Sequence, residues 1–351
     1  MNKHVGTETI RQWALKDIGR SNLELVEAAK PVPADNEVLV KIAAVSLNYR
    51  DNLLVETGLG FSRPNGQPMV PGSDAAGEVA AVGSAVTRFK PGDQVISTFM
   101  AGWVEGLGPG TARQPTSATL GGPLKGLLAD YAVLDQECWV KAPKSLNAAA
   151  ASTLVCAGLT AWTALVERGR LRAGQTVVVQ GTGGVALFGL QIAAAHGAET
   201  LVISGDDAKL ERAKALGATH GINRHNQDWV EAVWEMTGDR GADHILEIIG
   251  GAHLGKSLEA AAVGGRVSLI GILEGFDVSG SFAMLARKRL IVEGIQVGHR
   301  RSLEDLVRAV DRAGIKPVID AEYEMADLPV ALDHLARGPF GKIVVAVNPK
   351  K

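Results

Sequence analysis

The stretch 176–186, TVVVQGTGGVA, decides the fold. Its first five residues form an unbroken apolar run typical of a buried strand, and a glycine-rich turn follows and opens a helix. The turn has the pattern G-x-G-x-x-A, with Gly181, Gly183 and Ala186 at the spaced positions. The first glycine allows a tight turn, the second lets the backbone approach a pyrophosphate, and the small third residue lets helix and strand pack together.

This turn predicts a dinucleotide-binding site. The helix that starts there offers unpaired N–H groups and a positive dipole to phosphates. The residues expected to contact the cofactor at the turn are Gly181, Gly183, Gly184 and Val185. The alternative is a glycine turn with a purely structural role, and the strand before it and the helix after it weigh against that alternative.

Apolar runs alternate with helical patterns between residues 147 and 313. The expected strands are 176–180, 200–204, 243–249, 266–270 and 291–297, with a short third strand that ends before Arg224. The expected helices are 184–197, 207–216, 226–237, 252–262 and 302–313. Such alternation predicts an α/β fold with a doubly wound parallel sheet that is covered on both faces. This domain is predicted to occupy 147–313.

The rest of the chain has a different pattern. Short strand-like segments separated by turns predict a second, β-rich domain formed by 1–146 and 314–351. These segments are 37–44, 76–82, 94–97, 128–134 and, near the C-terminus, 341–347. Within this domain, 101–126 is rich in Gly, Pro, Thr and Ser and has no periodicity, which is typical of a lid or binding loop and equally of a surface insertion.

Composition excludes several classes of function. The 36 Lys and Arg residues nearly balance the 38 Asp and Glu residues, so the chain has no basic surface for nucleic acid. The uncharged stretch 148–166 consists mostly of Ala, Thr, Ser and Gly, which favours a buried helix over a membrane span. The start of the chain has no apolar segment of the signal-peptide type, so a cytoplasmic location is expected.

The end of the second strand decides which dinucleotide is bound. NAD sites usually place an acid there to bond the ribose 2′-hydroxyl, and this chain has Ser204 instead. Ser204, Lys209 and Arg224 together favour a 2′-phosphate, and hence NADPH over NADH. Asp206 and Asp207 argue the other way, and Lys209 and Arg224 could be ordinary surface charges.

The whole chain resembles the medium-chain dehydrogenase/reductase superfamily, and within it the zinc-free, zeta-crystallin-like quinone oxidoreductase branch. The resemblance spans nearly all 351 residues. Besides the glycine turn, it rests on LNYRD at 47–51, PGSDAAG at 71–77, AGLTAW at 157–162, AKALGA at 213–218, GGRV at 264–267 and FGK at 340–342. It implies a GroES-like β-rich catalytic domain, a Rossmann domain, a small-molecule substrate and a homodimer.

The superfamily also contains alcohol dehydrogenases that bind a catalytic zinc ion, and each of their zinc-ligand positions has a counterpart in this chain. The resemblance places Asn48, Ser73, Asp74 and Cys156 where those relatives hold zinc with a cysteine, a His–Glu pair and a second cysteine. An amide and a hydroxyl are poor zinc ligands, and one thiolate with one carboxylate leaves the site short of three protein ligands. No metal is therefore expected.

Without a metal to polarise a carbonyl, hydride transfer needs an acceptor that is already electrophilic, such as a quinone or an α,β-unsaturated carbonyl. Hydrogen-bond donors must then stabilise the charge on the acceptor oxygen. The resemblance assigns this role to the segment of Asn48, Tyr49, Arg50 and Asp51, with Asn48 and Tyr49 as the better candidates. Arg50 and Asp51 could instead pair to brace their loop, and all four residues could be structural.

Further cofactor contacts are implied near the nicotinamide ring. Thr160 and Lys342 resemble residues of that pocket, and Ile270, Gly271 and Gln296 follow the fifth and sixth strands, where the ring should lie. The predicted function is therefore a NADPH-dependent quinone or enone reductase. The alternatives are a NAD(P)-dependent alcohol or aldehyde dehydrogenase of the same superfamily and a low-turnover NADPH-binding protein.

Overall fold

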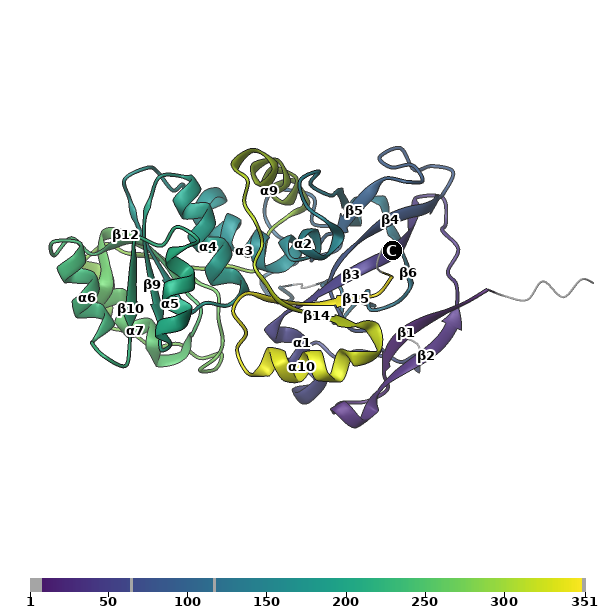
Figure 1. Ribbon diagram of the computed structural model, residues 1–351, viewed down its shortest axis with the longest axis horizontal. Helices are drawn as coiled ribbons and strands as arrows, with labels where there is room; N and C mark the ends of the chain where they lie inside the picture. The colour runs from purple at the N-terminus through teal and green to yellow at the C-terminus, as the bar shows by residue number, and fades with distance from the viewer. Residues whose placement is uncertain (1–7, 64–65, 116–117, 349–351) are drawn as a thin grey trace, which may run out of the picture. The chain divides into compact units, whose positions relative to one another are not determined.

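The computed structural model describes residues 8–63, 66–115 and 118–348 (Figure 1). The chain forms two compact units: unit 1 consists of Met1–Cys156 and His299–Lys351, and unit 2 of Ala157–Gly298. The boundaries predicted from the sequence are 146/147 and 313/314, whereas in the structure 147–156 and 299–313 belong to the β-rich unit. Residues 1–7, part of the segment used in the signal-peptide argument, lie outside the described residues.

The helix α9 (Arg300–Ala313) accounts for the shift of the second boundary. Arg88 Nη2 donates a hydrogen bond to Glu304 Oε1 at 2.9 Å, and the Ser145 amide donates to Asp311 Oδ1 at 2.9 Å. Both contacts fasten α9 to unit 1. Sequence periodicity does not reveal this attachment, because a helical pattern shows that one face is apolar and not which unit that face meets.

Unit 2 contains a six-stranded parallel sheet in the order β10-β9-β8-β11-β12-β13. Its strands are β8 (Thr176–Gln180), β9 (Glu199–Ser204), β10 (His220–Asn223), β11 (Ala242–Glu247), β12 (Ala261–Leu269) and β13 (Ile291–Gly294). The first strand of the unit, β8, lies in the middle, and the order reverses between β8 and β11. This is the doubly wound arrangement that the alternating strands and helices predict.

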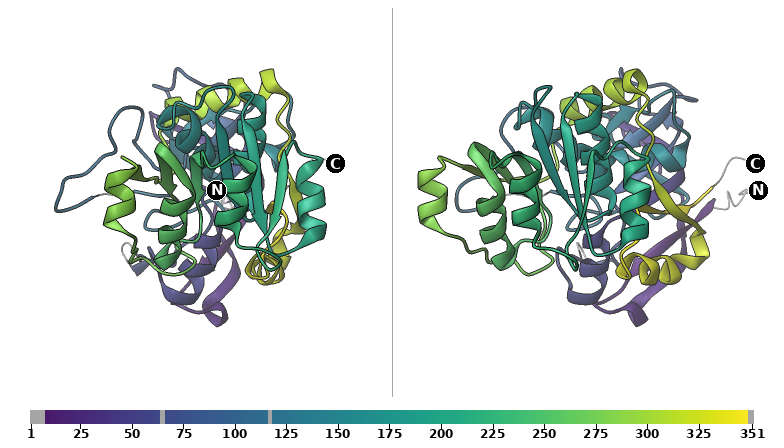
Figure 2. Two further views of the ribbon diagram at one scale, coloured as in Figure 1. Left: turned by 90° about the vertical axis from the view of Figure 1, so that its left-hand side faces the viewer. Right: turned by 60° about the vertical axis from the view of Figure 1, so that its left-hand side comes forward.

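Helices cover both faces of this sheet, as Figure 2 shows from two sides. On one face lie α4 (Gly184–Ala195) and α5 (Asp207–Lys214), and on the other lie α6 (Trp229–Met236) and α7 (Leu254–Ala260). The short α8 (Phe282–Arg287) precedes β13. Val178, Leu201 and Ile245 of the sheet are fully buried in one core with residues of α6 and α7. The strands are apolar throughout because neither face of the sheet meets water.

Unit 1 is built on a seven-stranded sheet with the path β14-β15-β3-β4-β5-β7, and β6 pairs with β3. Its strands are β3 (Glu37–Leu47), β4 (Asp74–Val82), β5 (Gln94–Ser97), β6 (Tyr131–Asp135), β7 (Trp139–Lys141), β14 (Ile319–Glu324) and β15 (Lys342–Ala346). A separate hairpin consists of β1 (Thr9–Leu15) and β2 (Leu23–Ala29). Because β15 lies between β14 and β3, the C-terminal segment completes the sheet of the N-terminal segment.

Two helices of unit 1, α1 (Tyr49–Thr57) and α10 (Leu328–Ala336), share the core of the sheet through Leu54 and Leu332. The uncharged stretch near 148–166 is helical and mostly buried, as its composition predicts. It consists of α2 (Ala148–Ser152), a π-helical turn at Leu154–Gly158, α3 (Leu159–Trp162) and a second π-helical turn at Thr163–Glu167. None of the described helices is long and apolar enough to cross a membrane.

The predicted strands are right in position and least accurate at their ends. The strands at 94–97 and 176–180 have the predicted bounds, whereas the strand predicted at 291–297 ends at Gly294. Val297 has a φ of 55°, which turns the chain out of the extended conformation. The segment 49–57, treated as a loop in the sequence analysis, forms α1. The described part of 101–126 contains turns and isolated bridges but no helix or strand.

Gly77 provides a test of the close pairing of β3 and β4. A Cβ atom at this position would lie 2.2 Å from the Lys41 carbonyl oxygen, which is backbone and cannot move aside alone. We expect Gly77→Ala to lower the free energy of unfolding by about 1–3 kcal/mol, measured by urea denaturation. In Gly255→Ala the new Cβ meets nothing closer than 4.0 Å, and alanine favours the helix by about 1 kcal/mol. Equal losses in both variants would contradict this packing.

Candidate functional site

The glycine turn of unit 2 lies where the sequence places it. Gly181 follows β8 with a φ of 78°, and Gly183 precedes the first turn of α4, which Gly184 and Val185 open. A Cβ atom at Gly181 or Gly183 would point into open space. The space next to these two glycines, at the start of α4, is therefore open. A phosphate group fits such a region, because helix N-termini present unpaired donors and a positive dipole.

At the end of β9 lie Ser204 and Arg224, two of the three residues that the sequence assigns to a 2′-phosphate. The Arg224 amide donates to the Ser204 carbonyl oxygen at 3.0 Å, which pairs the ends of β9 and β10. A Cβ atom at Gly205 would lie 3.1 Å from Arg224 Cζ and 2.5 Å from His225 Nε2, so both side chains lie over this glycine. The sequence analysis singles out Arg224 there and misses His225. Lys209 lies in the first turn of α5.

The two acids near this strand end have other partners. Asp206 Oδ1 accepts a hydrogen bond from the Lys209 amide at 3.1 Å and caps α5. Asp207 Oδ1 accepts from Asn223 Nδ2 at 2.7 Å. Each carboxylate thus has a structural task in the loop, which weakens the argument that either serves as the acid of an NAD site.

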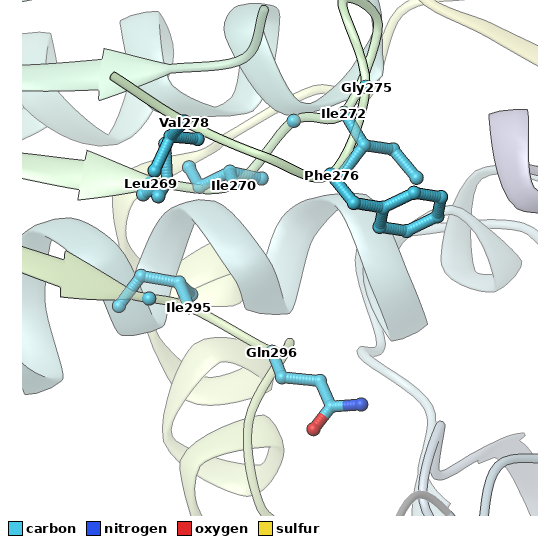
Figure 3. Close-up of a pocket in the computed structure, with 10 residues that line it drawn as sticks. Leu269, Ile270, Ile272, Gly275, Phe276, Val278, Ile295 and Gln296 are labelled. Carbon is cyan, nitrogen blue, oxygen red and sulfur yellow. The ribbon is translucent and has the colours of Figure 1, made fainter. Parts of the chain in front are cut away.

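A cavity of about 380 Å³ lies beyond the carboxyl ends of β12 and β13 (Figure 3). Three residues predicted to lie near the nicotinamide ring line it, namely Ile270, Gly271 and Gln296. Phe276 lies at its edge with 68% of its surface exposed. Thr160 is buried in α3. The same helix packs against Gly298, because a Cβ atom at Gly298 would lie 3.0 Å from Leu159 Cγ. The structure thus brings 270–271 and 296 to one cavity.

In unit 1, the candidate catalytic segment is the first turn of α1. Asn48 precedes the helix, and its amide N–H donates to Asp51 Oδ2 at 2.7 Å. Tyr49 is 45% exposed, whereas Asn48 and Asp51 are buried. Helix formation here follows from the Asn-x-x-Asp spacing, since an acid three residues into the helix satisfies the N–H of the capping residue.

Arg50 braces this segment, although not through Asp51. Its guanidinium donates to the Leu120 carbonyl oxygen at 2.9 Å, to Thr119 Oγ1 at 3.1 Å and to the Gly122 carbonyl oxygen at 2.7 Å. Arg50 makes its hydrogen bonds to residues 119–122 and none to Asp51 within the described residues, although its charge lowers the pKa of Asp51. Arg50 instead orders the end of the 101–126 region against α1.

Lys342, at the start of β15, lies against the same segment. Its side chain is only 4% exposed, and Nζ donates to Asn48 Oδ1 at 2.6 Å and to the Leu47 carbonyl oxygen. The first of these bonds fixes the orientation of the Asn48 amide. Among the described residues, Asn48 Nδ2 completes no hydrogen bond, although it lies close enough to Asp74 to lower the pKa of that carboxyl. The sequence resemblance predicts Lys342 near the cofactor, whereas its contact with Asn48 is evident only in the structure.

Asp74 is fully buried beside this pair. Its Oδ1 accepts from Ser73 Oγ at 2.6 Å, and its Oδ2 accepts from the Cys156 amide at 3.0 Å. Burial raises the pKa of Asp74, and the charge of Lys342 opposes that rise. Burial also raises the pKa of Asp51 to about 6 and that of the Cys156 thiol to about 12. The cluster of Asn48, Asp51, Asp74, Cys156 and Lys342 is hereafter called the polar cluster.

A zinc ion does not fit this donor set. Zinc binds thiolates, neutral imidazoles and carboxylates, whereas Asn48 offers a neutral amide and Ser73 a hydroxyl at the aligned positions. The Lys342 ammonium, bonded to Asn48 Oδ1, would also repel a divalent cation. Among the described residues, no group of three or more His, Cys, Asp or Glu side chains could hold a metal ion.

Two buried polar residues of unit 2 escape the sequence analysis. Gln180 ends β8 and Glu247 ends β11, and Gln180 Nε2 donates to Glu247 Oε2 at 3.0 Å. The signal that could have found them is a polar residue directly after each of two short apolar runs, in VVVQ at 177–180 and ILE at 245–247. In a doubly wound sheet those ends face the ligand crevice.

Asp51 predicts a pH dependence of stability. Its pKa of about 6 in the folded protein lies above the ordinary value of 3.8, so between these two pH values the folded state binds more protons than the unfolded chain. Stability therefore falls as the pH rises from about 4 to 6, by up to about 3 kcal/mol. Asp51→Asn removes this loss, so its stability relative to wild type should grow between pH 4.5 and 7.5 in urea denaturation. A constant difference across that range would contradict this assignment.

Comparisons with known proteins agree with this architecture. The family described as "Alcohol dehydrogenase GroES-like domain" matches residues 34–144, and the family described as "Zinc-binding dehydrogenase" matches residues 184–312. A zinc-type alcohol dehydrogenase-like protein of Schizosaccharomyces pombe is 37% identical over 89% of this chain and 91% of its own length. The human quinone oxidoreductase is 27% identical over 91% of this chain and 92% of its own length.

Solved structures support the same relationship. A protein provisionally named alcohol dehydrogenase from Sinorhizobium meliloti 1021 is 58% identical and superposes with a TM-score of 0.93 over 97% of this chain and 99% of that chain. The GroES-like domain and the Rossmann domain that the sequence resemblance implies are both confirmed. The chain therefore belongs to the medium-chain dehydrogenase/reductase superfamily of nicotinamide-dependent oxidoreductases.

Proposed function

We propose that this protein is a zinc-independent, NADPH-dependent reductase of quinones or of activated carbon–carbon double bonds. The observation that carries the proposal is the bond between Lys342 Nζ and Asn48 Oδ1. The resemblance aligns Asn48 with a zinc-ligand position of related alcohol dehydrogenases, and here a buried ammonium supplies the positive charge.

The polar cluster suits an acceptor that needs no Lewis acid. When bound, the reduced nicotinamide supplies a hydride, and the acceptor takes up one proton as well. Lys342 holds Asn48 Oδ1, and Asn48 Nδ2, which lies near Asp74 without completing a hydrogen bond, is the donor that we propose for an acceptor oxygen. Tyr49, whose side chain is partly exposed, is the candidate second donor. A quinone or an enone is already electrophilic, so such donors suffice, whereas a simple aldehyde needs stronger polarisation.

The acceptor class is tested by following NADPH consumption with EDTA-treated protein and three acceptors: a quinone, an enone and a simple aldehyde. We expect turnover with the quinone or the enone and a rate unchanged by chelation. Turnover with the aldehyde alone would favour the alcohol dehydrogenase alternative. A stoichiometric zinc content that activity requires would overturn the metal-free proposal, and cofactor binding without turnover of any acceptor would favour a binding protein.

The preference for NADPH rests on the end of β9. Ser204 replaces the acid of an NAD site, Asp206 and Asp207 are engaged in the loop, and Arg224 and His225 lie over Gly205. A guanidinium at this place can bind a 2′-phosphate with paired, charge-assisted hydrogen bonds. Lys209 in the first turn of α5 adds a second positive charge.

Arg224→Ala should separate the two cofactors. Loss of a charge-assisted bond costs about 1.5–3 kcal/mol, so we expect the Kd for NADPH to rise about 10- to 100-fold and the Kd for NADH to stay nearly constant, both measured by fluorescence titration. The matched control is Arg287→Ala. Arg287 ends α8, which precedes β13, and β13 and β10 are the two opposite edge strands of the sheet. This substitution should change neither the Kd for NADPH nor the Kd for NADH. An unchanged NADPH to NADH ratio in Arg224→Ala would refute the phosphate assignment.

We also propose a homodimer acting on a small-molecule substrate in the cytoplasm. β13 is the last strand in its sheet order, so one of its edges has no partner strand within the described residues of unit 2. Ile291 at its start is about half exposed. Uncovered edge strands favour pairing with a second chain, which supports a dimer through this edge.

A further inference from the structure

The strand order of unit 2 reverses between β8 and β11, and two polar side chains lie at that point. Gln180 is the last residue of β8, and Glu247 is the last residue of β11. Both side chains are buried, and that of Glu247 is inaccessible to solvent. In open parallel sheets, ligands bind in the crevice outside the carboxyl ends of the strands at such a reversal. The pair therefore lies directly beneath the predicted dinucleotide site.

Glu247 accepts hydrogen bonds from five donors. The amides of Ile249 and Gly250 donate to Oε1 at 2.9 and 3.0 Å. Gln180 Nε2 and His253 Nδ1 contact Oε2 at 3.0 Å each, and Ser257 Oγ also donates to Oε2. Burial raises the pKa of Glu247, but the hydrogen bonds from His253, Ser257 and Gln180 and the charge of His253 outweigh it and lower the pKa to about 2. A buried carboxylate with this many donors is ionised. Its bonds to the Ile249 and Gly250 amides hold the loop 248–250 against the end of β11.

The Gln180 amide has only one orientation that satisfies its neighbours. Its Oε1 accepts from the Ile248 amide at 3.1 Å, while Nε2 donates to Glu247 Oε2 and to Ser257 Oγ at 2.9 Å. Since the next residue is Gly181, the start of the glycine turn is tied to the loop 248–250 through this one side chain.

The same loop holds the wall of the cavity beyond β12. A Cβ atom at Gly271 would lie 1.4 Å from the Ile248 carbonyl oxygen, so the two backbones are in direct contact. The Glu274 amide donates to the Ile249 carbonyl oxygen at 3.0 Å, and the Ser279 amide to that of Gly251 at 3.2 Å. The glycine turn, the loop 248–250 and the segment 270–279 thus form one connected unit around Glu247.

We infer that Glu247 is a positioning residue for the cofactor: its carboxylate, through Gln180, sets the glycine turn in register with the wall of the cavity that receives the nicotinamide end. The inference requires only that the chain binds a nicotinamide dinucleotide, as its superfamily does, and it is independent of the acceptor and of the preference for NADPH.

Exchanging the two side chains tests this inference. In Glu247→Gln the amide oxygen is needed by the Ile249 and Gly250 amides, so the new NH₂ group faces Gln180 Nε2, and two donors oppose each other. In Gln180→Glu two carboxylates oppose each other. Either change should raise the Kd for the cofactor by about 10-fold or more. The double variant restores one amide facing one carboxylate, and its Kd should return to within about 3-fold of wild type.

The matched control is Glu199→Gln. Glu199 Oε2 accepts from Thr176 Oγ1 at 3.0 Å at the opposite, amino-terminal end of β8 and β9, so the Kd for the cofactor should stay unchanged. Wild-type Kd values in both single variants would overturn the inference. An equally weakened double variant would overturn it as well, because the loss would then reflect general damage to packing. Thermal unfolding of each variant separates loss of fold from loss of binding.

Two further measurements keep the test decisive. If either single variant fails to fold, Ser257→Ala removes one donor to Glu247 and should raise the Kd about 3-fold, and an unchanged Kd would overturn the inference. All titrations are run with NADPH and with NADH. A wild type that prefers NADH would refute the proposed cofactor preference, whereas the ratio of variant to wild type with the preferred cofactor would still decide the role of Glu247.

Discussion

The ionised carboxylate of Glu247 is the constraint on which the organisation of unit 2 depends. A parallel sheet whose order reverses at its centre leaves the ends of two neighbouring strands facing one crevice, and the backbone groups of the loops there need partners. Glu247 supplies an acceptor to the loop 248–250 and, through Gln180, to the strand that leads into the glycine turn. The segments that line the predicted cofactor site are therefore held by one buried charge rather than by loop packing alone.

In unit 1, by contrast with Glu247, the buried carboxyl groups are not fully stabilised in their ionised form. Lys342, Asp51 and Asp74 are all buried, and their charges partly balance, but the balance is incomplete: the pKa values of both carboxyl groups remain raised. Titratable side chains with strongly shifted pKa values are found most often at functional sites. Asn48 Nδ2 completes no hydrogen bond among the described residues, although it lies close enough to Asp74 to lower the pKa of that carboxyl, and it is the donor proposed above for an acceptor oxygen.

Local sequence patterns were sufficient for the strands of unit 2 and its helices α4 to α7, but they did not predict the short α8 and were insufficient for several elements of unit 1. The strand at 176–180 and its glycine turn obey short-range rules, since apolar runs and glycine spacing are local properties. The hairpin of β1 and β2 and the helix α1 were missed because their apolar residues are few and become buried only against distant segments, such as Met325 beneath Trp13. The attachment of α9 to unit 1 depends in the same way on partners 160 or more residues away, Ser145 among them.

The sequence by itself determined the fold class and the dinucleotide turn, because both are set by residue type and by spacing along the chain, and the family resemblance added which residues stand at the zinc-ligand positions. Only the tertiary structure showed that Lys342 bonds to Asn48, that Arg50 holds 119–122 rather than Asp51, and that Gln180 meets Glu247. These contacts join residues 67 to 294 positions apart. Hydrogen bonds act over about 3 Å, and no local pattern shows which distant polar groups the packing of strands brings within that range.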